Sequence, residues 1–113
     1  MRSIIAATIT MLPVRAAISD AKAERIVDAI WFIEGGQRAK APYGILSVKV
    51  KDKDHARAVC KRTVINNYRR WEKAGKPGRY FDFLADRYCP PSADRVGNRN
   101  WKRNIRALTG EDI

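Results

Sequence analysis

The feature that most constrains this chain is a series of segments in which apolar residues recur at helical spacing, with glycine or proline between the segments. Ser19 or Asp20 can cap the first predicted helix, and Gly35-Gly36 ends it. The apolar stripe of this helix consists of Ile26, Val27, Ile30, Trp31 and Ile33.

A second, longer amphipathic helix is predicted from Asp54 to Lys73. Its apolar or aromatic positions are Val59, Cys60, Val64, Tyr68 and Trp71. A third helix, from about Tyr80 to Tyr88, cannot continue through Pro90-Pro91.

The last helix is expected to begin at Asn98 or Asn100 and to stop at Gly110. It places Trp101, Ile105 and Leu108 on one face. Between the first two helices, Leu46, Val48 and Val50 alternate with polar residues, as in a short strand. The predicted fold class is mainly α, a small helical domain with at most a short β segment.

Composition limits the number of domains and the kind of partner. A chain of 113 residues with 45% hydrophobic and 31% charged residues suits one folded domain. Its formal net charge of +11 favours a polyanionic partner: nucleic acid, bacterial cell wall or anionic lipid. No apolar run reaches the ~20 residues that a membrane-spanning helix needs.

Residues 1–16 resemble a short secretory signal peptide, which leaves a domain at 17–113. Arg2 supplies the positive charge, an uncharged and mostly apolar stretch follows, and Val14-Arg15-Ala16 fits a small-residue cleavage site. An N-terminal helix or tail is the alternative. Export would place the protein in the periplasm or outside the cell; without it, the protein would be cytoplasmic until phage or virion release.

Cys60 and Cys89 bear on the same question. In an exported protein they could form one disulfide, and in the cytosol they would be two thiols. No cysteine–histidine spacing typical of a metal site occurs, and no cofactor is predicted.

Glu34 is the candidate catalytic residue. It ends an apolar helical run, one turn after Ile30 and Trp31. Apolar neighbours and the partial negative charge of a helix C-terminus both favour the neutral carboxylic acid. A protonated carboxylic acid is what glycosidic bond cleavage needs as general acid, a rule whose standard example is lysozyme. A solvated glutamate at a helix end is the ordinary alternative.

Three segments in order resemble the lysozyme-like lytic transglycosylases. Ile33-Glu34-Gly35-Gly36 and then Tyr43-Gly44-Ile45-Leu46-Ser47 resemble the segment in which a helix ends in the catalytic Glu and a Gly-Leu-Met-Gln stretch lines the sugar cleft. The stretch from Arg87 to Ser92, followed by Asn98, Trp101 and Asn104, resembles the segment with a Tyr over the cleft. Ser47 replaces the Gln of the larger enzymes, and Gly35 replaces their Ser.

The resemblance implies a lysozyme-like catalytic domain that cuts the β-1,4 bond between N-acetylmuramic acid and N-acetylglucosamine in peptidoglycan. It is closest to the compact enzymes of phage and of secretion or conjugation machinery. Glu34 would act as both acid and base and would give a 1,6-anhydro product. Tyr43, Gly44, Ser47 and Tyr88 would bind substrate, with core packing as the alternative role of both tyrosines.

A lysozyme-type hydrolase (muramidase) would need a second carboxylate, for which Asp52 and Asp54 are the candidates. A solvated turn that caps the next helix is their alternative role. The rival functions are a small basic nucleic-acid-binding protein and an inactive wall-binding protein of the same fold. Basic residues spread over several helices rather than one recognition helix make nucleic acid the weaker candidate.

Overall fold

The computed structural model describes residues 18–46 and 48–113, so the predicted signal peptide and Ser47 lie outside the described residues. The described part is mainly helical, which confirms the predicted fold class. Its elements are α1 (Asp20–Ile33), the 3-10 turns η2 (Gly36–Arg38) and η3 (Pro42–Gly44), α2 (Lys53–Lys73), α3 (Tyr80–Tyr88) and α4 (Arg95–Thr109). None of these helices is long and apolar enough to cross a membrane.

The prediction of a short strand around Leu46, Val48 and Val50 is wrong. These residues form an irregular loop, and the described residues include no strand. Leu46 is 87% exposed and Val48 is also exposed. Alternation stabilises a strand only where one face packs on a core and a partner strand takes up the backbone hydrogen bonds. Of these three side chains only Val50 packs against the core, and the described residues supply no partner strand.

Helix α1 begins and ends where the sequence predicts. The Ser19 side chain accepts a hydrogen bond from the backbone N–H of Lys22 at 3.1 Å, so Ser19 is the N-cap. At the other end, the backbone N–H of Glu34 bonds to the carbonyl of Ile30, and Gly35 adopts a left-handed φ of 110°. Because only glycine takes this conformation without strain, Glu34 becomes the last residue that continues the helix.

The start of α4 corrects the sequence prediction by about one turn. Asp94, not Asn98 or Asn100, is the N-cap, and its side chain accepts from the backbone N–H of Gly97 at 2.8 Å. Asn98 instead lies within α4. Its side chain is buried and donates hydrogen bonds to the carbonyl of Cys89 and to the carboxylate of Asp86. Gly110 ends the helix with a φ of 70°, as predicted.

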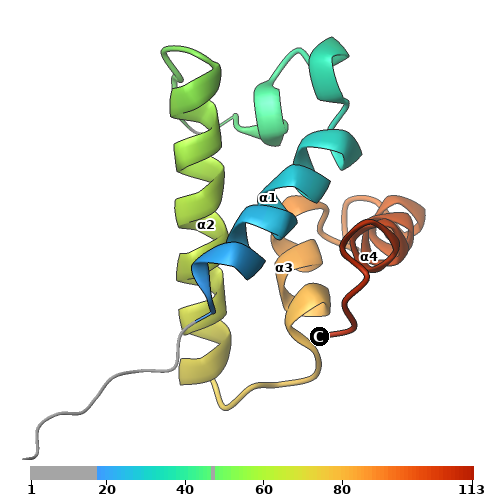
Figure 1. Ribbon diagram of the computed structural model, residues 1–113. Helices are drawn as coiled ribbons and strands as arrows, with labels where there is room; N and C mark the ends of the chain where they lie inside the picture. The colour runs from blue at the N-terminus through green and yellow to red at the C-terminus, as the bar shows by residue number, and fades with distance from the viewer. Residues whose placement is uncertain (1–17, 47) are drawn as a thin grey trace, which may run out of the picture.

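Helix α1 lies between α2 and α4, while α3 packs against both of these helices (Figure 1). The turn η3 contacts α1 and α2. All four helices contribute to one hydrophobic core, and burial of each large apolar side chain contributes about 1.5–3 kcal/mol. Its largest fully buried side chains are Tyr80, Phe81, Ile26, Ile30, Leu84, Ile105, Val27, Val64 and Cys60.

Ion pairs join the exposed edges of α1 and α2. Glu24 pairs with both Arg57 and Lys61, and these two cations also bind Asp28 and Asp20. Hydrogen bonds from Lys61 and Arg57 lower the pKa of Glu24 below its ordinary value of 4.5. The ionised form of Glu24 therefore stabilises the folded state.

This lowered pKa predicts a pH-dependent contribution to stability. The contribution of Glu24 is complete above its unfolded pKa and is lost as the pH falls through its lower folded pKa. Glu24→Gln should therefore lower the urea midpoint at about pH 6, and its difference from wild type should shrink toward about pH 3. Glu72→Gln, which changes a carboxylate outside the ion pairs, is the control. A difference that stays constant with pH would contradict this assignment.

Candidate functional site

The carboxylate of Glu34 is held by the indole of Trp101. Glu34 lies half-buried at the C-cap of α1, and its Oε2 accepts a hydrogen bond from Trp101 Nε1 at 3.0 Å. Trp101 comes 67 residues later, on α4. This bond therefore fixes the end of one helix against the side of another.

Trp101 is itself held in place by packing. It is 4% exposed and stacks on the ring of Tyr88, with centroids 5.2 Å apart and planes 16° apart. The Tyr88 hydroxyl faces the Cys60 Sγ at 3.6 Å. Burial raises the pKa of the Cys60 thiol to about 11 and raises that of Tyr88 above its usual range. Both groups therefore stay neutral at physiological pH, so neither adds a charge beside Glu34.

Gly44 brings the backbone of η3 against the same carboxyl group. A Cβ added at this position would lie 2.5 Å from Glu34 Oε1 and 2.8 Å from its Cδ, closer than real Cβ contacts come. Gly44 also has a φ of 68°, in the left-handed region. Glycine is thus required here for two reasons, backbone conformation and space.

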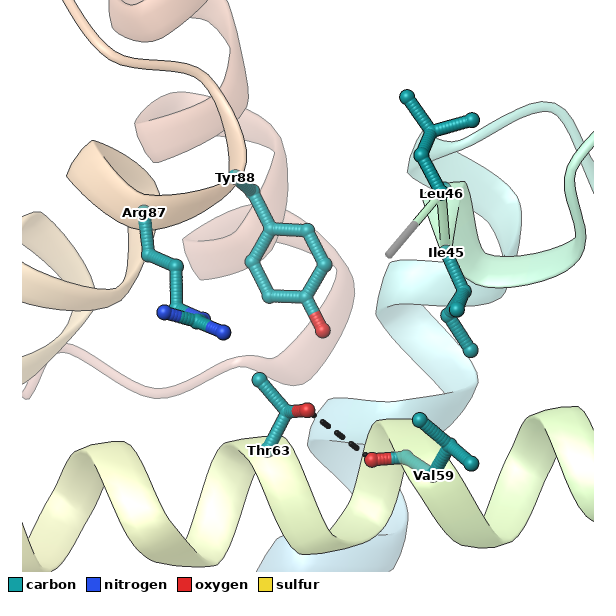
Figure 2. A pocket seen from close by; sticks show the side chains of 7 residues that line it. Ile45, Leu46, Val59, Thr63, Arg87 and Tyr88 are labelled. Carbon is teal, nitrogen blue, oxygen red and sulfur yellow. Dashed lines mark hydrogen bonds between the residues drawn. The ribbon is translucent and has the colours of Figure 1, made fainter. Parts of the chain in front are cut away.

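A pocket of about 370 Å³ opens beside Gly44. Ile45 and Leu46 form one wall, and Arg87 and Tyr88 from the end of α3 lie across from them (Figure 2). Val59 and Thr63 of α2 form the floor. Glu34 is not among the lining residues. Its Oε1 lies against Gly44, which is itself one of the lining residues.

Of the predicted substrate-binding residues, Gly44 and Tyr88 line this pocket, whereas Tyr43 does not. Tyr43 is only 2% exposed and packs in the core, and its hydroxyl accepts a bond of 3.4 Å from Arg57. This burial agrees with the core packing that was its alternative role, although Tyr43 also borders a different pocket together with Trp31 and Arg57. Its contact with a sugar stays a prediction. Ser47 lies outside the described residues.

Asp52 and Asp54 take the structural role that was their alternative. Asp52 is the N-cap of α2, with its side chain accepting from the backbone N–H of His55 at 2.8 Å. Asp54 is an exposed residue of the first turn. Neither lines the pocket beside Glu34.

Cys60 and Cys89 are free thiols in this structure, which is the alternative to the disulfide expected in an exported protein. Cys60 is buried against the Tyr88 hydroxyl, while the half-buried Cys89 lies 4.0 Å from the carbonyl of Asp94. Each thiol thus has a separate environment. Within residues 18–46 and 48–113, no group of three His, Cys, Asp or Glu residues is placed to hold a metal ion.

Comparisons with models of protein families, with curated proteins and with solved structures give no match to this chain. The site and the sequence motifs are therefore the basis for assigning a function.

The sequence assigned no role in this site to Trp101, Arg87 or Thr63. Trp101 and Arg87 lie in the third segment of the resemblance, but helical spacing placed Trp101 in the core and Arg87 was one of many basic residues. Thr63 lies on a helix face that no motif marks. Only the crossing of α2, α3 and α4 brings these side chains to the same place.

The close approach of Gly44 to Glu34 predicts the effect of adding one methyl group. Gly44→Ala should destabilise the fold by more than Gly78→Ala, which has a similar φ of 65° but nothing within 4 Å of its added Cβ. Left-handed strain costs about 1–2 kcal/mol in both variants. The clash with Glu34 should add about 1–3 kcal/mol in Gly44→Ala alone.

Urea unfolding of the two variants beside wild type measures this difference. Equal losses of stability would show that the Glu34 carboxyl does not press on position 44. Shortening the side chain in the double variant Gly44→Ala, Glu34→Ala should recover much of the excess cost, since the clashing carboxyl is then absent.

Proposed function

We propose that this protein cleaves the glycan strands of peptidoglycan as a lytic transglycosylase, with Glu34 as general acid and base. The observation that carries the proposal is that the two carboxyl oxygens of Glu34 have different surroundings. Oε2 accepts from Trp101, while Oε1 lies against Gly44 of the pocket lining and accepts no protein hydrogen bond among the described residues. One oxygen is held in place, and the proposal assigns the proton transfer to the other.

The proposed reaction moves one proton through this carboxyl group. Protonated Glu34 gives its proton to the glycosidic oxygen as the bond from that oxygen to C1 of N-acetylmuramic acid breaks. The resulting carboxylate then takes the proton of the sugar's own 6-hydroxyl, whose oxygen bonds to C1. The products are a free 4-hydroxyl on N-acetylglucosamine and a 1,6-anhydro ring, and water is not consumed. The N-acetyl group of the substrate would stabilise the positive charge that develops.

Transglycosylase is favoured over hydrolase by the surroundings of Glu34. The pocket lining includes no Asp or Glu, and Asp52 is engaged as a helix cap. A hydrolase of the lysozyme type generally uses a second carboxylate close to the acid. A transglycosylase, as the resemblance implies, works with one.

The net charge of +11 is compatible with peptidoglycan and with nucleic acid, since both are anionic. The pocket and the held carboxyl group favour the glycan, because a nucleic-acid-binding surface has no need of either. To act on peptidoglycan, the protein would have to reach the cell wall by export, by phage release or within a larger secretion or conjugation machine.

The first test compares digestion of purified peptidoglycan by wild type, Glu34→Gln and the control Glu72→Gln. Wild type and the control should release 1,6-anhydro-muropeptides, identified by mass spectrometry. Glu34→Gln should lose at least about a hundredfold in rate, because general acid catalysis contributes typically 10²–10⁴-fold.

Products with reducing ends would change the assignment to a hydrolase with the same acid. Release of no muropeptide by wild type would overturn the proposal. Binding of the protein to nucleic acid, with affinity that falls steeply with salt, would then favour the rival function.

The bond from Trp101 to Glu34 predicts a second effect on activity. Trp101→Phe keeps an aromatic ring to stack on Tyr88 but removes the donor to Oε2. The released carboxyl should lower kcat about tenfold or more with little change in KM, since a hydrogen bond to a charged group contributes about 1.5–3 kcal/mol. An unchanged kcat in a folded Trp101→Phe variant would show that this bond does not position the acid.

A further inference from the structure

Arg87 is a cation at the pocket that pairs with no acidic residue of the described segments. It lies exposed in the last turn of α3 and lines the pocket beside Tyr88. None of the ion pairs within the described part of the chain includes it.

The acidic residues of the same helix are already engaged. Asp82 pairs with Arg106 at 3.0 Å and Asp86 pairs with Lys102 at 3.6 Å, both across to α4. The two carboxylates of α3 are thus paired with α4, whereas the guanidinium of Arg87 lies at the pocket. Figure 2 shows the Arg87 side chain extending beside Tyr88 toward Thr63 and facing the Ile45–Leu46 wall.

The other lining groups offer few hydrogen-bond donors. Ile45, Leu46 and Val59 are apolar, and the Thr63 hydroxyl donates to the carbonyl of Val59 at 3.0 Å. Arg87 is therefore the main source of donors. Its planar guanidinium carries five N–H groups in a fork that matches a carboxylate with two parallel bonds.

We propose that Arg87 binds a carboxylate group of the substrate, so that the protein prefers an acidic glycan to a neutral one. This inference rests on the proposed function and names its substrate class. Arg87 attracts an anion on the side of the pocket opposite Ile45 and Leu46. In the proposed reaction Glu34 is protonated when substrate binds, so it adds no opposing charge. The position of Arg87 therefore sets which way along the pocket a carboxylate-bearing sugar lies.

Peptidoglycan can supply such a carboxylate from two sources. One is the lactyl group of N-acetylmuramic acid in strands without peptides, and the other is the peptide stem in intact wall. The recognising chemistry is the same for both. Chitin oligosaccharides have the same β-1,4-linked N-acetylated backbone and no carboxylate, so they are the neutral comparison.

The test measures binding of the protein to intact peptidoglycan, to peptide-free glycan strands and to chitin oligosaccharide. Wild type, Arg87→Gln, Arg87→Lys and Arg95→Gln are compared. Arg95 is exposed, lies on α4 outside the pocket and forms no ion pair in the part that the structure describes, so Arg95→Gln matches the loss of charge. Arg87→Gln should weaken binding to at least one acidic ligand by about tenfold or more and leave chitin binding unchanged.

Arg87→Lys should recover part of this loss, since it keeps the charge but not the planar fork. A loss confined to intact wall assigns the carboxylate to the peptide stem, and a loss confined to peptide-free strands assigns it to the lactyl group; both support the proposal. Equal effects of Arg87→Gln and Arg95→Gln, an equal loss on chitin, or no binding of wild type to any ligand would overturn it.

Failure of this inference is distinguishable from failure of the proposed function. If wild type releases anhydro-muropeptides and Arg87→Gln binds every ligand as wild type does, only the role of Arg87 is lost. If the Arg87-dependent preference is found but wild type releases no product, the carboxylate site stands and the reaction is wrong.

Discussion

Burial of α1 between α2 and α4 is the constraint on which the candidate site depends. Ile26 and Ile30 are fully buried, so the helix cannot rotate or slide without exposing them to water. The carboxyl end of α1 is thereby fixed relative to both neighbours. Gly35 then ends the helix by leaving the right-handed conformation, and Glu34 remains as its last polar side chain.

Three different kinds of contact determine the position of the Glu34 carboxyl group. The end of α1 fixes where the Glu34 side chain starts. The backbone of Gly44 limits the carboxyl group on the Oε1 side, and the Trp101 indole holds Oε2. Trp101 in turn depends on its stack with Tyr88, and the Tyr88 hydroxyl faces Cys60 in the core. A chain of neutral side chains thus connects the hydrophobic core to the carboxyl group of Glu34 beside the pocket.

Local signals allowed most of the fold to be predicted from the sequence. The glycine stops at Gly35 and Gly110 and the proline stop after α3 act through the backbone of their own segment, so the sequence alone reveals them. The choice between Asp94 and Asn98 as the cap of α4 depends on which side chain has buried partners, and no local pattern encodes that. The prediction of a strand at Leu46 was wrong for the same reason. A strand requires a partner strand from elsewhere in the fold, which no local pattern reveals.

The site was predicted in part. Glu34, Gly44 and Tyr88 belong to short motifs, and the structure brings Gly44 against the Glu34 carboxyl group and into the lining of the same pocket as Tyr88. Trp101 and Arg87 belong to the third motif, but their contacts at the site are tertiary and no sequence pattern shows them.

Within the described part of the chain, nine of the twelve acidic residues are engaged in ion pairs or as helix caps, and the ion pairs use seven basic residues. At a distance, a polyanion senses the net charge of +11, whichever of the charges are paired, so the molecule presents a positive field to it. Capture at a distance is then an ionic-strength-dependent event, governed by the Debye length and separate from the contact chemistry at the pocket.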